Sequence, residues 1–173
     1  PNLRETLTVV TSVALFLLVV GLLASVQAGE TPHATWFTII PGIDLAFAVE
    51  PLGMLFALIA SFLWIPTSFY AFGYMRAHEE ENQTRFYACF AIALGSTMGV
   101  AFAANLFTLF LFYEALTLVT YPLVSHKETD EAKAGGRKYV IYLLGAAKVL
   151  LLAAIILTYN EAGALYYRDG GIL

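Results

Sequence analysis

The chain has 173 residues, of which 60% are hydrophobic and 13% are charged, and its mean hydropathy is +0.75. A soluble domain is about half apolar and about a quarter charged, so this composition excludes an ordinary soluble protein and indicates an integral membrane protein. The formal net charge is −4, and no basic patch is interleaved with aromatic residues, which excludes nucleic acid as a partner.

Five apolar stretches are long enough to cross a bilayer, since a helix needs ~20 such residues to span ~30 Å of hydrocarbon. Helices also satisfy their own backbone hydrogen bonds in lipid. The first stretch exceeds the ~7–15-residue core of a signal peptide, so it is interpreted as a retained span. The predicted fold class is therefore all-α integral membrane, one bundle over residues 1–173 with spans at 7–27, 51–74, 86–104, 106–124 and 138–159.

The connections between these spans carry the polar residues. Residues 29–50 form a long loop that ends in GIDLAFAVEP, whose alternation predicts a short strand or a surface-lying segment. Residues 76–85 form a polar turn, where three successive glutamates predict a solvated face. A very short turn at 104–105 makes the third and fourth helices antiparallel neighbours, and 125–138 is predicted to be the last loop.

Lysine and arginine set the predicted orientation, because cytoplasmic loops carry an excess of these residues. One side holds only Arg168. The opposite side, with the N-terminus, holds seven: Arg4, Arg76, Arg85, Lys127, Lys133, Arg137 and Lys138. The sequence therefore predicts a multi-pass membrane protein, with the N-terminus of this chain cytoplasmic and the C-terminus external.

Two ionisable residues fall in the middle of predicted spans. Glu114 lies ten residues before Val124, and Lys148 lies ten residues after Lys138. At ~1.5 Å per residue both lie ~15 Å below the same surface, on consecutive antiparallel helices. A direct or water-bridged pair is therefore expected.

Each such residue costs ~2.5–3.5 kcal/mol at a bilayer centre, which makes it a candidate functional residue. One alternative is a fixed interhelical ion pair, although such pairs rarely stabilise better than well-packed apolar residues. The favoured interpretation is a proton relay in which Glu114 and Lys148 titrate as a coupled unit.

Five further residues are candidate helpers of the relay. Thr117 and Tyr121 share a helix face with the buried carboxylate and could hold water beside it, or could simply bond the backbone or a neighbouring helix. Lys138 and Tyr142 lie one turn apart and could lead a proton inward, although a lysine at a helix end is often a snorkelling anchor. His126, at the edge of the last loop, could donate protons.

No other pattern for chemistry is present in the sequence. Metal-ligand spacing, a nucleophile elbow and a phosphate-binding loop are absent, and Cys89 is the only cysteine. The sequence therefore predicts an ion transporter without a cofactor rather than an enzyme.

Three stretches resemble the antiporter-like membrane subunits shared by complex I and Mrp-type cation/proton antiporters, most closely the D-type group of the Mrp proteins: EPLGMLFALIASFLWIPTSFYAFGYM, NQTRFYACFAIALGSTMGVAFAANLFTLFLFYEALTLVTYPLVSHKET and EAKAGGRKYVIYLLG. The resemblance covers about residues 50–163. It implies that this chain is a fragment equivalent to helices two to six of a fourteen-helix subunit. Glu114 matches the family's functional glutamate on the fifth helix, whose family partner is a lysine on the seventh. Lys148 falls on the sixth helix instead.

The resemblance implies proton translocation in exchange for Na⁺ or another monovalent cation, in a bacterial inner membrane and with lipid and other membrane subunits as partners. One alternative is a proton-pumping subunit of complex I or a membrane-bound hydrogenase. Another is a scaffold subunit that transports nothing.

Overall fold

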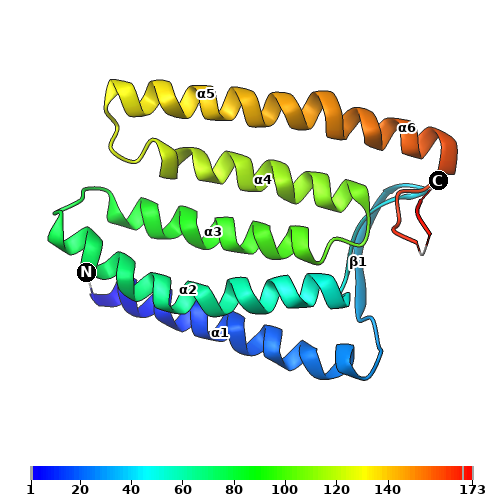
Figure 1. The fold of residues 1–173 in the computed structure, drawn as a ribbon, viewed down its shortest axis with the longest axis horizontal. Helices are drawn as coiled ribbons and strands as arrows, with labels where there is room; N and C mark the ends of the chain where they lie inside the picture. The colour runs from blue at the N-terminus through cyan, green and yellow to red at the C-terminus, as the bar shows by residue number, and fades with distance from the viewer. Residues whose placement is uncertain (1, 169, 173) are drawn as a thin grey trace.

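The chain folds mainly into long helices, as the computed structural model of residues 2–168 and 170–172 shows (Figure 1). Two strands follow the first helix and pair into an antiparallel hairpin. The elements in chain order are α1 (Asn2–Gln27), β1 (His33–Ile40), β2 (Ile43–Ala48), α2 (Pro51–Ala77), α3 (Gln83–Ala101), α4 (Leu106–Val124), α5 (Asp130–Ala146), the π-helical segment η1 (Ala147–Leu151) and α6 (Leu152–Ala162).

The helices lie side by side, and α5, η1 and α6 continue one another as a single rod (Figure 1). Among the helices, the most extensive interface joins α3 to α4, and the next joins α1 to α2. A buried apolar cluster ties the first three helices together through Val19, Val49, Met54, Ala57 and Met98. The bundle is thus built from neighbours in the sequence, with α4 between α3 and α5.

Four of the predicted spans coincide with helices long and apolar enough to cross a membrane: α1, α2, α4 and the rod of residues 130–162. Helix α3 is not apolar enough to be counted with these four, because its 19 residues begin with the polar residues Gln83, Thr84 and Arg85. It nevertheless lies between α2 and α4 (Figure 1). A fifth span at α3 stays a prediction.

The long loop predicted at 29–50 is mostly a hairpin. The strand alternative for GIDLAFAVEP is confirmed by β2, but the pairing strand β1 was not predicted. The hairpin crosses one end of the bundle (Figure 1), where the Tyr159 hydroxyl donates to the Pro41 carbonyl at 2.9 Å. Gly42 at the turn has φ +83°, and an added Cβ would strike the Gly163 carbonyl, so the turn requires glycine.

The predicted loop at 125–138 is wrong for residues 130–138, which are helical. Thr129 caps this helix by accepting a hydrogen bond from the Ala132 amide at 3.1 Å, and Asp130 and Glu131 favour its N-terminal dipole. The turn before α4 is also longer than predicted, because α3 ends at Ala101 rather than residue 104.

Candidate functional site

Glu114 and Lys148 lie close together about halfway along α4 and the rod of α5, η1 and α6. The Lys148 Nζ lies 3.9 Å from the Glu114 Oε2. The expectation that the two side chains lie close together is confirmed, although the count from Lys138 as the start of the helix was wrong. That helix begins at Asp130, and the whole segment before Lys148 is helical.

The two charges are held loosely rather than locked together. The distance exceeds the ~2.7–2.9 Å of a charge-assisted hydrogen bond. The Glu114 side chain is 16% exposed and the Lys148 side chain 58% exposed. The Glu114 Oε1 is buried and has no hydrogen-bond partner among the residues that the structure describes. An unpartnered carboxylate oxygen in an apolar bundle is energetically unfavourable, so it is a candidate for binding a proton or water.

Lys148 lies on η1, where the helix widens to π-type hydrogen bonding over Ala147–Leu151. Such segments are rare and frequently occur at functional sites. The extra residue in the turn changes the direction in which the following side chains point. The apolar run that contains Lys148 gave no sign of this segment, so the sequence did not predict it.

The candidate helpers on α4 mainly serve the helix packing. The Thr117 hydroxyl donates to the Tyr113 carbonyl at 3.0 Å, in line with the backbone-bonding alternative. The Tyr121 ring packs against Gly136 of α5. A hydroxyl pair that the sequence did not reveal joins the helices nearby, since Thr120 Oγ1 and Tyr139 Oη lie 2.8 Å apart.

Lys138 and Tyr142 do not reach the buried carboxylate. Both are exposed on α5, and neither forms an ion pair or side-chain hydrogen bond within the described part of the chain. Since α5 begins eight residues before Lys138, that lysine is not at a helix end as predicted. The structure therefore does not assemble these two residues with Glu114.

His126 lies in the turn that follows α4, twelve residues after Glu114. Its Nε2 is 3.9 Å from the Glu80 Oε2, and both side chains are mostly buried. They line a polar cavity of about 310 Å³ between the turns at 78–82 and 126–129. The prediction of a solvated glutamate face is therefore wrong for Glu80, because the α4–α5 turn covers it.

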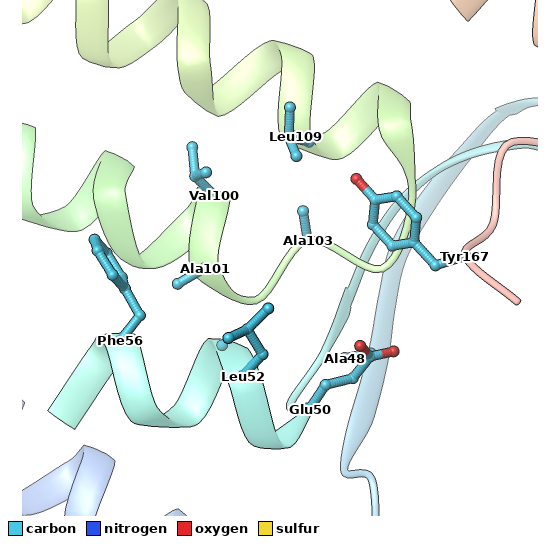
Figure 2. A pocket seen from close by; sticks show the side chains of 10 residues that line it. Ala48, Glu50, Leu52, Phe56, Val100, Ala101, Ala103, Leu109 and Tyr167 are labelled. Carbon is cyan, nitrogen blue, oxygen red and sulfur yellow. The ribbon is translucent and has the colours of Figure 1, made fainter. Parts of the chain in front are cut away.

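A cavity of about 470 Å³ lies at the opposite end of the bundle and is mainly apolar. Figure 2 shows Leu52, Phe56 and Leu109 facing this space, with Tyr167 and Glu50 on the hairpin side. Pro51 begins α2, and Glu50 directly precedes it without making a side-chain capping bond. The cavity has no cluster of ionisable groups, so the Glu114–Lys148 pair stays the stronger candidate site.

Comparison with known proteins supports the resemblance seen in the motifs. Residues 103–169, which include both charges, match a family described as NADH:quinone oxidoreductase/Mrp antiporter, TM. Over 151 residues the chain is 24% identical to the A/B component of a probable K(+)/H(+) antiporter of Rhizobium meliloti (strain 1021), covering 86% of this chain and 15% of that protein. Over 144 residues it is 25% identical to NADH-quinone oxidoreductase subunit L of Escherichia coli (strain K12), covering 83% and 23%.

The fold is also that of a solved Mrp complex from Dietzia sp. DQ12-45-1b. The TM-score is 0.77 at 19% identity, with 95% of this chain and 31% of that chain covered. The chain thus spans only 15% and 23% of the Rhizobium meliloti and Escherichia coli relatives. Those two relatives are an A/B-type and an L-type subunit, and the expected likeness to the D-type group stays a prediction.

Proposed function

Because the chain has the fold and the sequence signature of antiporter-like membrane subunits related to complex I, we propose that it moves protons through the Glu114 carboxylate and the neighbouring Lys148. The exchanged ion is Na⁺ or another monovalent cation. This antiport is the activity that the name of the Rhizobium meliloti relative states for K⁺ and protons. The protein works in a bacterial cell membrane beside other membrane subunits.

The observation that carries the proposal is the loosely paired carboxylate of Glu114. In an ion pair that only stabilises the fold, the two charged groups would be expected at hydrogen-bond distance. The second carboxylate oxygen would also be expected to accept a hydrogen bond. Here the pair distance is 3.9 Å, and the second oxygen has no partner among the described residues. At this separation the Coulomb attraction is about 4 kcal/mol for an effective dielectric constant of ~20. Lys148 can therefore influence Glu114 strongly without holding it permanently.

The step assigned to these residues is a reversible proton transfer. When the Glu114 carboxylate binds a proton it becomes neutral, and its attraction to the Lys148 ammonium is lost. The lysine side chain is more than half exposed in this segment and has four rotatable bonds, so it can move to another partner. Release of the proton restores the attraction and brings Lys148 back.

The test is transport by the intact protein that contains this chain, reconstituted in liposomes with a pH-sensitive dye inside. Glu114→Gln keeps the size and polarity of the side chain but cannot exchange a proton, so cation-driven proton movement is expected to fall at least tenfold. Glu161→Gln is the matched control, because this exposed residue at the end of α6 undergoes the same chemical change. Transport that survives Glu114→Gln unaltered would support the scaffold alternative.

A redox-driven complex is the second candidate, favoured by the similarity to subunit L of an NADH-quinone oxidoreductase. The same liposomes distinguish the two functions. Proton movement driven by a cation gradient with no electron donor present supports the antiporter. Movement that appears only when an electron donor and acceptor are added supports the redox-driven complex.

A further inference from the structure

A groove on the side of the bundle is mainly apolar in one part and charged in the other. The mainly apolar part, about 290 Å³, lies between α4 and α5 and is lined by Leu118, Tyr121, Arg137, Val140 and Ile141. Tyr121 and Arg137 also line a second hollow of about 270 Å³ nearer the α4–α5 turn. Three further charged residues line that second hollow: Arg85, Lys133 and Glu128. One continuous surface is therefore apolar at one end and charged at the other.

The charge of this surface is positive after internal pairing. Arg85 forms an ion pair with Glu128 and also donates to the His126 carbonyl. Lys133 and Arg137 form no ion pair with any residue that the structure describes. They lie four residues apart and so share one face of α5. The acids of the first turn of α5, Asp130 and Glu131, line neither hollow.

The position along the rod matches a membrane boundary. The rod of residues 130–162 has 33 residues, which at ~1.5 Å per residue exceeds the ~30 Å hydrocarbon core. Its apolar run starts just after Lys138, so Lys133 and Arg137 fall at headgroup level. Leu118 and Ile141 lie deeper and are 56% and 68% exposed.

We propose that this groove binds an anionic phospholipid. The phosphate lies against Arg137 and Lys133, and one acyl chain lies along Leu118 and Ile141. The planar guanidinium of arginine suits bidentate contact with phosphate, and basic pockets between membrane helices at the cytoplasmic side are suited to lipid headgroups. A free phosphate would leave the apolar half of the groove unused. This site is independent of the proposed transport function.

The test is native mass spectrometry of the intact, delipidated protein titrated with phosphatidylglycerol or phosphatidylcholine. Arg137→Gln and Lys133→Gln are each expected to weaken phosphatidylglycerol binding about fivefold, while Arg137→Lys retains most of it. Lys138→Gln is the matched control, since it removes the same charge from α5 but lines neither hollow. Proton transport by the Glu114→Gln protein is measured separately from lipid binding. The lipid site and the proposed transport function can therefore each be refuted without the other.

Four outcomes would overturn this site. Equal binding of phosphatidylcholine would show an apolar groove without headgroup recognition, and equal loss in Lys138→Gln would show only diffuse surface charge. Competition by inorganic phosphate alone would point to a simple anion site. A nitroxide at Ile141→Cys, in a Cys89→Ala protein, should be accessible to dissolved oxygen. Full protection would show that a protein helix covers the groove instead.

Discussion

At the scale of single residues, Asp44 organises the end of the bundle that carries the hairpin. The Tyr166 hydroxyl donates to its Oδ2 at 2.6 Å. The Asp44 carbonyl accepts from the Asn105 amide at 2.9 Å and from the Thr108 hydroxyl at 3.2 Å. Asn105 also caps α4 by accepting from the Thr108 amide. One aspartate therefore joins the hairpin, the start of α4 and the segment after α6.

This arrangement predicts an acid-dependent loosening of the hairpin. Hydrogen bonds from Thr38 and Tyr166 hold the pKa of the Asp44 carboxyl below its ordinary value of 3.8. Because the folded-state pKa is depressed, the stabilisation is present above pH 3.8 and is lost as the pH falls through the lower folded-state value. Trp36 packs edge-on against Phe47, with ring centroids 5.2 Å apart, so its fluorescence reports on the hairpin.

The measurement is a pH titration of Trp36 fluorescence in a Trp64→Phe protein, which removes the second tryptophan. A change is expected only below pH 3.8, and it should disappear in Asp44→Asn. Tyr166→Phe removes one of the two hydrogen bonds, so the transition should move up toward 3.8. A midpoint above that value in the unsubstituted protein would contradict the assigned role of Asp44.

The residues of the candidate site were only partly predictable. Glu114 and Lys148 stand out because a charge within an apolar run is visible in the sequence itself. The Thr120–Tyr139 hydroxyl pair is not visible in the same way. Its formation depends on the rotation of α5 about its axis, and threonine and tyrosine are common in membrane helices.

At the scale of elements, glycine at one position sets the contact between α3 and α4. Gly95 and Gly99 lie four residues apart on α3 and so share one helix face. At Gly99 an added Cβ would enter the ring of Phe112. At Gly95 nothing lies within 4 Å of an added Cβ. Close approach of the two helices therefore depends on Gly99 alone of this pair.

We expect Gly99→Ala to destabilise the intact protein by ~1–3 kcal/mol, because the Phe112 ring is held by its neighbours and the helices must separate. The ring also packs edge-on against Phe47, with centroids 5.5 Å apart. Gly95→Ala is the control and should be neutral or stabilise by up to ~1 kcal/mol through helix propensity. Thermal unfolding in detergent, followed by circular dichroism, compares them. Equal midpoints for the two variants would refute the close contact.

The helices and strands also differ in how well the sequence predicts them. The apolar runs placed α1, α2 and α4 well, since length and hydropathy alone determine a membrane helix. The first two turns of α5 were assigned to a loop because polar residues were equated with non-helical structure. Thr129 followed by two acidic residues was a readable helix-start signal. Strand β1 was missed because its side chains are exposed throughout and show no burial alternation.

At the scale of the whole molecule, polar contacts gather at the end opposite the hairpin. The N-terminus and the α2–α3 and α4–α5 turns meet at this end (Figure 1). Arg76 pairs with Glu5, Arg4 bonds Gln83 and Thr84, and Arg85 pairs with Glu128. These bonds fix the three segments to one another. Seven of the nine lysines and arginines thus lie toward one end, with Lys148 at mid-span and Arg168 near the hairpin.

This asymmetry predicts that the end with the N-terminus is cytoplasmic, because lysine and arginine are retained on that side during insertion. Two exposed glutamates report on the two ends: Glu79 in the α2–α3 turn and Glu30 before the hairpin. Each is replaced by cysteine in a Cys89→Ala protein, and intact cells are treated with a membrane-impermeant maleimide. Glu30→Cys should react at once, whereas Glu79→Cys should react only after the membrane is opened. The reverse pattern would invert the orientation and would place the headgroup contacts of Lys133 and Arg137 in the outer leaflet.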